Sequence, residues 1–246
     1  MKKLFKIFNQ VSIQNSKIYN FKNTAFCLII CCRISNIISP ILINFKIDPN
    51  KITYFNFLLA TSLVTIILFL KTDLIYISIF LYFLCCIIDF CDGTVARFYK
   101  ITSYYGKFID GLVDIFLKSF LILSLAFYSY KIFNDFNLLI FGCIASILAS
   151  FDTFILDRYS AIVRWFNSEK KTNILPYVRK KFLLRFNLIL NDLFIILFGS
   201  MFVTKDNLDL FYYNFICLFL IVIISAIQNL SLHIFLSHKY LKNDKN

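Results

Sequence analysis

The chain is poor in the residues that soluble proteins and turn-rich folds need. Only 16% of its 246 residues are charged, and it has five Gly, three Pro, one Trp and two His. An ordinary soluble domain is about 25% charged, so this composition excludes a disordered chain and an ordinary soluble enzyme. So few glycines and prolines leave little room for a turn-rich all-β fold, and no segments of alternating hydrophobicity typical of a membrane barrel occur.

Apolar residues are abundant instead. They make up 59% of the chain, with 31 Phe and 14 Tyr, and the mean hydropathy is +0.74. A helix of about 20 apolar residues crosses a bilayer. By that length the sequence predicts six membrane-spanning helices, at 53–70, 74–96, 105–130, 138–155, 183–203 and 210–235. We therefore expect an all-α, polytopic membrane protein.

The net charge is +12, from 26 Lys and Arg against 14 Asp and Glu. The connectors 71–73, 131–137 and 205–209 carry one basic residue each, and most of the others lie in the loops and termini on the opposite side. Basic loops stay cytoplasmic, so we expect both termini in the cytoplasm of a prokaryotic cell, with the chain in its inner or cell membrane. No base-reading motif occurs, and we expect no nucleic-acid partner.

The first 50 residues differ from the predicted spans. Leu4, Ile7, Phe8 and Val11 form an apolar stripe at helical spacing, with lysines beside it. This pattern predicts a basic amphipathic helix on the membrane surface. The apolar segment 24–44 is interrupted by an arginine and a proline, and we interpret it as a second interfacial helix; a seventh span is the alternative.

No internal repeat or low-complexity linker divides the chain. We expect an interfacial N-terminal segment at 1–50, a six-helix membrane domain at 51–238 and a short cytoplasmic tail at 239–246. The eight cysteines all lie in apolar segments, with no CxxC pair and no Cys/His spacing. They are therefore expected to be small buried residues in a reducing compartment rather than zinc ligands.

Four aspartates interrupt the second and third predicted spans: Asp89, Asp92, Asp110 and Asp114. The first pair is three residues apart and the second pair four, so each pair lies on one face of its helix. The short connector between these helices makes them antiparallel neighbours, so the two pairs should meet near the cytoplasmic ends. Carboxylates inside a membrane are costly and indicate function by default.

Four clustered negative charges need cationic partners. Carboxylate oxygens favour a hard divalent cation, Mg²⁺ or Mn²⁺, and two such ions would nearly neutralise the cluster and suit phosphoryl chemistry. Gly93, Ala96 and Gly106 lie within about one helical turn of these acids. Their small size leaves room for a bulky ligand; close helix packing is the alternative interpretation.

The pattern between Asp89 and Asp114 resembles the signature of the CDP-alcohol phosphotransferase (CDP-alcohol phosphatidyltransferase) family, D-x2-D-G-x2-A-R-x8-G-x3-D-x3-D. Every fixed position and every spacing matches. The stretch 49–53, Pro-Asn-Lys-Ile-Thr, also resembles a segment that often opens the first span in this family. Six spans and cytoplasmic termini are consistent with the resemblance.

The resemblance implies an enzyme of phospholipid biosynthesis that moves a phosphatidyl-type group from a CDP-linked lipid, such as CDP-diacylglycerol, to a small alcohol and releases CMP. It implies that Asp89, Asp92 and Asp110 hold the metal ions. Asp114 would lie near the second ion and act as the base that takes the proton of the acceptor. The residues implied to contact the nucleotide or donor are Gly93, Ala96, Arg97, Gly106 and Thr53. A homodimer is also implied.

Three basic residues are candidates for binding an acceptor phosphate. Lys118 lies four residues beyond Asp114 on the same helix face, and Arg158 and Arg164 follow the fourth predicted span. They lead us to expect a phosphorylated polyol such as glycerol phosphate or inositol phosphate as acceptor. For Lys118 the alternative is an ion pair or snorkelling, and for the arginines a topology anchor. An amino-alcohol acceptor is the alternative for the enzyme.

Two other classes of function compete with a transferase. A catalytically silent scaffold of the same fold is one, although the intact set of aspartates argues against it. An ion transporter is the other, and it would place acids near the bilayer midplane along several helices. Here the acids cluster at one end of two adjacent helices, which favours the enzyme.

Overall fold

The computed structural model describes residues 2–20, 24–69, 75–101, 103–170 and 181–241; within these, the side chains at 2–3, 157, 160, 163–170, 181–185 and 236–241 are not described. The described residues form eight helices and no strand, which confirms the all-α prediction. The helices are α1 (Lys2–Ile18), α2 (Phe26–Asn44), α3 (Pro49–Phe69), α4 (Ile75–Tyr99), α5 (Tyr104–Phe133), α6 (Phe136–Lys170), α7 (Lys181–Thr204) and α8 (Leu208–Leu241).

Six helices among the described residues are long and apolar enough to cross a membrane, but they are not quite the six expected. Helix α2 belongs to this set, whereas α5, which contains the predicted third span, does not. Helix α5 has 30 residues, but Lys107, Asp110, Asp114 and Lys118 place charges along its first half. Composition alone therefore allows α2 to span the membrane. Its position relative to the other helices follows from its packing.

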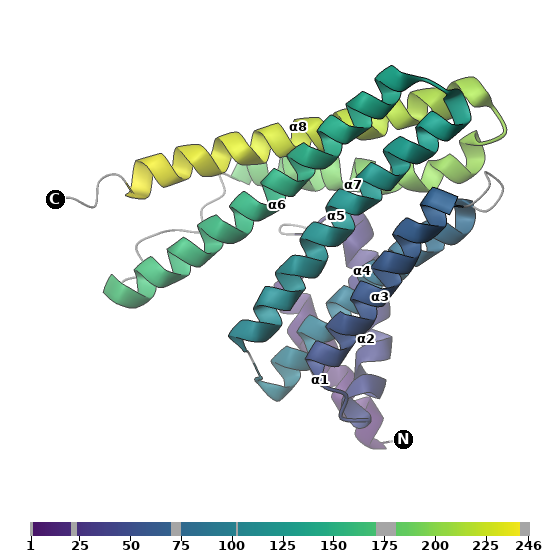
Figure 1. Ribbon diagram of the computed structural model, residues 1–246. Helices are drawn as coiled ribbons and strands as arrows, with labels where there is room; N and C mark the ends of the chain where they lie inside the picture. Colours follow the sequence, from purple (N-terminus) through teal and green to yellow (C-terminus); the bar gives the residue numbers. More distant parts are fainter. Residues whose placement is uncertain (1, 21–23, 70–74, 102, 171–180, 242–246) are drawn as a thin grey trace.

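Helices α1 and α2 form a hairpin against the C-terminal half of α4 (Figure 1). Ile7 and Ile43, near the open end of the hairpin, line one cavity together with Tyr99 at the end of α4. Directly after the end of α1, the ring of Tyr19 contacts the ring of Phe90, with centroids 5.0 Å apart. Helix α1 therefore runs antiparallel to α4, and α2 returns beside it to the same end of the molecule.

The apolar stripe of α1 packs against the protein. Ile7 and Val11 are 7% and 0% exposed, and they share a core with Cys31 of α2 and Val95 of α4. The predicted helix is present, but the centre of its stripe contacts neighbouring helices rather than facing outward. The physical reason is that α2 and α4 offer an apolar surface, which removes these side chains from water as effectively as lipid would.

Helix α5 joins two packed groups of helices. Helices α3 and α4 pack together and α3 packs against α5, while α6 packs against both α5 and α8, and α7 against α8. One apolar core lies among α5, α6, α7 and α8 and extends to the end of α3 and the start of α4, and a second lies between α1, α2, α3 and α4. The second core includes side chains from the half of α4 that carries Asp89 and Asp92.

Side chains cap the starts of two helices near this region. Asp192 of α7 accepts hydrogen bonds from the backbone N–H groups of Phe26 and Cys27, both at 2.8 Å, at the first turn of α2. Ser103 accepts one from the N–H of Gly106 at 2.9 Å and so begins α5. These N–H groups have no carbonyl partner within their own helix, so the caps fix where α2 and α5 begin.

All eight cysteines are free thiols. Cys31, Cys32, Cys85 and Cys91 are buried, as expected of small apolar side chains. Cys217 is exposed on α8, within a candidate span, so the expectation of burial is wrong for this residue.

Candidate active site

The four signature aspartates meet where α4 and α5 lie side by side. Asp89, Asp92 and Asp110 each direct one carboxylate oxygen to a common point, and these oxygens lie within 4.8 Å of one another. Asp92 is 5% exposed, Asp89 and Asp110 are half-buried, and Asp114 is exposed. Asp114 lies one turn beyond Asp110, outside this group of three. The predicted convergence of the two helix faces is therefore confirmed for three residues.

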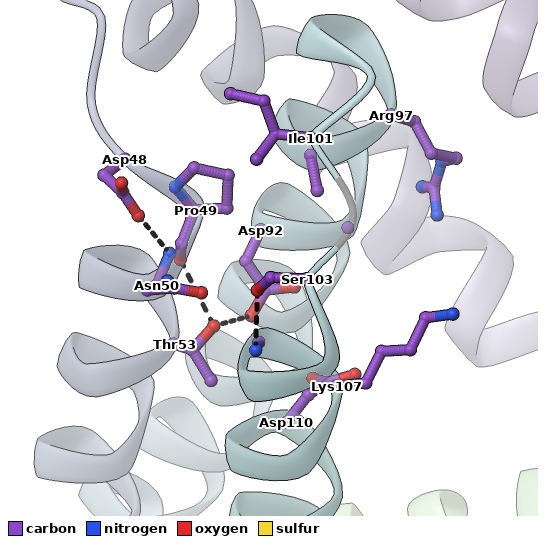
Figure 2. Close-up of a pocket in the computed structure, with 13 residues that line it drawn as sticks. Asp48, Pro49, Asn50, Thr53, Asp92, Arg97, Ile101, Ser103, Lys107 and Asp110 are labelled. Carbon is purple, nitrogen blue, oxygen red and sulfur yellow. Dashed lines mark hydrogen bonds between the residues drawn. The ribbon is translucent and has the colours of Figure 1, made fainter. Parts of the chain in front are cut away.

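A helix from the other side of the site holds one of these carboxylates. The hydroxyl of Thr53, on α3, donates to Oδ2 of Asp92 at 2.7 Å (Figure 2). Thr53 was expected to contact a nucleotide, and its hydroxyl also orients Asp92. A carboxylate with one oxygen held in this way keeps the other free for a cation.

A cavity of about 190 Å³ opens on one side of the aspartates, between the starts of α3 and α5 and the end of α4. We call it the first cavity, and Figure 2 shows it. Its walls include every residue that was expected to contact the nucleotide or donor: Thr53, Gly93, Ala96, Arg97 and Gly106. Asp92, Asp110 and Lys107 line it as well. Side chains from the start of α3, the end of α4 and the start of α5 thus surround one space.

The two glycines of the motif have specific neighbours. A Cβ atom on Gly93 would lie 3.1 Å from Nη1 of Arg97, so the guanidinium lies over the face that Gly93 leaves bare. A Cβ atom on Gly106 would lie 2.9 Å from Oδ1 of Asn50 and 3.0 Å from Oγ of Ser103. Gly93 therefore makes room for Arg97, and Gly106 lets α5 start close to α3.

Arg97 is held by residues outside the motif. Its Nη2 donates to Oγ1 of Thr94 at 3.3 Å and to Oδ1 of Asn15 at 3.4 Å. The ring of Tyr19 lies 5.4 Å from the guanidinium carbon. Burial raises the pKa of the Tyr19 phenol above its ordinary value, so the ring meets Arg97 as a neutral phenol.

The roles of Asn15 and Tyr19 were not predicted from the sequence. A signal was present, because Asn15 continues the helical stripe of Ile7 and Val11 as a polar residue. Asn15 is 1% exposed. A polar side chain at a buried position needs partners, but nothing in the local sequence indicates that the partner is Arg97.

A second cavity, of about 390 Å³, lies on the other side of the aspartates, among α2 to α8. Asp89 and Asp114 line it, together with Lys118, Asn191 and many apolar side chains of α4, α5, α7 and α8. Asp92 and Asp110 line the first cavity instead. The four aspartates therefore stand between two spaces, two facing each.

The three acceptor candidates have different surroundings. Lys118 lines the second cavity, and its ammonium forms an ion pair with Asp152 of α6, with a distance of 2.6 Å between Nζ and Oδ2. The Lys118 side chain is 38% exposed and that of Asp152 is 3% exposed. Arg158 is exposed and lines neither cavity. The side chain of Arg164 lies outside the described residues.

The donor set at the centre of the site fits a hard divalent cation. It consists of carboxylate oxygens from three residues, with no His or Cys among them. Mg²⁺ and Mn²⁺ prefer such ligands, whereas zinc sites usually include nitrogen or sulfur. The geometry therefore supports a site for one divalent ion at Asp89, Asp92 and Asp110.

The comparisons with known proteins agree with this chemistry. The sequence model of the CDP-alcohol phosphatidyltransferase family matches residues 46–228. A comparison with curated proteins found no match. The matched region includes the four aspartates and begins after α2. This multi-pass membrane protein therefore belongs to the CDP-alcohol phosphatidyltransferase family, whose members are metal-dependent transferases of substituted phosphate groups.

Proposed function

We propose that this protein transfers a phosphatidyl-type group from a CDP-linked lipid, CDP-diacylglycerol or a similar lipid, to an alcohol and releases CMP. The observation that carries the proposal is the position of the four aspartates between two cavities. A donor that lies across the aspartates would place its nucleotide in the first cavity. The acceptor alcohol would then approach the same phosphorus from the second cavity.

The first cavity offers groups that suit a nucleotide diphosphate. Arg97 and Lys107 bring positive charge to its wall. Nε of Arg97 is buried and has no hydrogen-bond partner among the described residues, so the guanidinium retains donors for a phosphate. The absence of a side chain at Gly93 allows this guanidinium to lie close to α4.

Asp89, Asp92 and Asp110 would hold a divalent ion, Mg²⁺ or Mn²⁺, and Asp114 would lie near a second one. Bound there, such ions would offset the charge of the diphosphate and of the departing CMP. Thr53 would keep one oxygen of Asp92 turned toward α3 while the other faces the ion. Removal of the acceptor proton and binding of the acceptor depend on residues of the chain.

Asp114 is the proposed base, because it lines the second cavity beside Asp89. Its carboxylate would take the proton of the acceptor hydroxyl as the hydroxyl oxygen forms a bond to the lipid-bearing phosphorus. The bond from that phosphorus to the CMP oxygen breaks, and CMP leaves with the electron pair. Holding both reactants in line across the aspartates removes much of the entropic barrier.

Lys118 supports a phosphorylated polyol, such as glycerol phosphate or inositol phosphate, as acceptor. It is the one cation among the described residues that line the second cavity. An ammonium has three N–H donors, so binding Asp152 leaves others for an acceptor phosphate. The same ion pair favours an amino alcohol as second candidate, because Asp152 offsets the charge of Lys118 and leaves Asp89 and Asp114 to attract an amine.

The test is CMP release by the purified full chain in detergent, with CDP-diacylglycerol, Mg²⁺ or Mn²⁺ and a panel of acceptors. The panel contains glycerol phosphate, inositol phosphate, serine and ethanolamine. We expect release that needs one acceptor and stops when the metal is chelated. Transfer to serine or ethanolamine alone would overturn the phosphorylated acceptor. If folded protein released no CMP with any acceptor, from CDP-diacylglycerol or CDP-archaeol, a silent scaffold would replace the enzyme.

A further inference from the structure

Helix α1 reaches the wall of the first cavity through one buried side chain. Asn15 is 1% exposed and uses both ends of its amide. Its Nδ2 donates to Oδ1 of Asn36 at 2.6 Å and to Oγ1 of Thr94 at 3.0 Å. Its Oδ1 accepts from Nη2 of Arg97. One residue of α1 therefore connects α2, α4 and the guanidinium that faces the cavity.

Thr94 and Tyr19 complete the network around Arg97. The hydroxyl of Thr94 accepts from both Asn15 and Arg97 and donates to the carbonyl oxygen of Phe90 at 2.7 Å. The ring of Tyr19, one turn beyond Asn15, covers the guanidinium. Arg97 is thus fixed on one edge, by Nη2, while its buried Nε has no partner among the described residues.

Fixing an arginine in advance changes how well it binds a phosphate. A free arginine side chain samples many rotamers, and ordering it has an entropic cost. A guanidinium held on one edge has already lost that freedom. Binding of a donor phosphate to the other edge therefore costs less conformational entropy. Asn15 has the geometry for this role, since it contacts Arg97 but is not among the residues lining the first cavity.

We propose that Asn15 is a positioning residue for Arg97, with the ring of Tyr19 supporting the same guanidinium, and that the α1–α2 hairpin is thereby part of the donor-binding unit. The hairpin precedes residue 46, where the match to the family begins. The inference rests on the proposed function, because it assigns Arg97 to the donor phosphates.

The test compares Asn15→Ala with Asn9→Ala, a change on the exposed face of the same helix. Asn15→Ala should raise the KM for CDP-diacylglycerol about tenfold, the effect of losing a hydrogen bond to a charged group, with the acceptor KM little changed. Asn9→Ala should leave both values near those of the unmodified chain. Equal losses in kcat and both KM values, or an unchanged donor KM, would overturn the proposal.

A double-mutant cycle separates positioning from packing. If Asn15 acts through Arg97, Asn15→Ala should have little further effect on the donor KM in the Arg97→Ala background. Independent, additive effects would show that Asn15 only packs the hairpin. If Arg97→Ala releases too little CMP to measure, equilibrium binding of CDP-diacylglycerol gives the same comparison.

Tyr19 provides a second route in case Asn15→Ala does not fold. Tyr19→Phe keeps the ring over Arg97 and should leave the donor KM close to normal, whereas Tyr19→Leu removes the ring and should raise it. Equal values for the two variants would contradict the proposal. Failure here is distinct from failure of the proposed function, since the unmodified chain would still release CMP.

Discussion

Asp114 differs from the other three signature aspartates in its surroundings. It alone lies outside the group that converges within 4.8 Å, and it lines the second cavity, together with Asp89. We therefore expect Asp114→Asn, which keeps the shape but cannot take a proton, to lose nearly all CMP release. Folding and CDP-diacylglycerol binding should be largely retained, as measured by thermal unfolding and equilibrium binding.

The matched control for this change is Asp206→Asn, an exposed acid between α7 and α8. It should keep full turnover. If Asp114→Asn also kept it, the base would have to be another residue of the second cavity. If Asp114→Asn instead lost donor binding, Asp114 would belong to the ion site.

Gly93 and Gly111 provide a second comparison at the scale of single residues. A Cβ atom on Gly93 would meet the guanidinium of Arg97, whereas one on Gly111 would have nothing within 4 Å. Gly93→Ala should therefore displace Arg97 and raise the donor KM several-fold. Gly111→Ala should leave KM unchanged and add about 0.5–1 kcal/mol of helix stability.

The donor KM is measured from CMP release at varied CDP-diacylglycerol. The change in stability is measured by thermal unfolding in detergent. A donor KM that is unaffected by Gly93→Ala would mean that Arg97 can move aside at no cost. In that case the guanidinium would not be fixed as the structure indicates.

The parts of the site that the sequence predicted are those that depend on local helical spacing. Residues three or four positions apart share a helix face whatever the rest of the chain does, so the pairing within 89–114 follows from the sequence alone. The contacts that it did not predict join distant segments: Asn15 to Arg97, and Lys118 to Asp152. No periodicity encodes such pairs, because the packing of whole helices decides them.

At the scale of elements, α2 depends on a side chain of α7 for its start. Asp192 accepts from the N–H groups of Phe26 and Cys27, which otherwise lack partners in their helix. Asp192→Ala should destabilise the fold by about 1 kcal/mol, as loss of a cap does, and lower the unfolding temperature. Asp206→Asn, which removes an exposed charge, serves again as control. An unfolding temperature equal to that of the control would mean that α2 is held by packing alone.

Helices α2 and α5 illustrate why composition and packing give different answers about which helices span the membrane. Segment 24–44 is apolar enough to span a membrane, yet α2 returns beside α1 to the end of α4. Helix α5 carries four charges in its first half, yet it packs against α3 and α6 along a core that joins both groups. Hydropathy measures single helices, whereas the placement of a helix depends on its neighbours.

At the scale of the whole molecule, the hairpin affects topology. Because α1 begins and α2 ends near Tyr99, we expect the hairpin to stay on one side of the membrane and the six helices from α3 to α8 to cross it, although α5 is not among the helices that composition alone identifies as spans. An even number of crossings leaves both termini on one side, and the basic loops suggest the cytoplasm. Reporter domains fused to either end should both show a cytoplasmic location in bacterial cells. Opposite locations would show that α2 crosses the membrane as a seventh span.

In the proposed reaction, the oxygen of the acceptor hydroxyl attacks the lipid-bearing phosphorus of the donor directly. The acceptor from the panel that releases most CMP would be prepared with ¹⁸O in its hydroxyl group, and the lipid product and CMP would be analysed by mass spectrometry. We expect all of the label to enter the phospholipid and none to enter CMP. Label in an ester of CMP with the acceptor, formed together with phosphatidic acid, would contradict it, because the acceptor would then have attacked the other phosphorus of the donor.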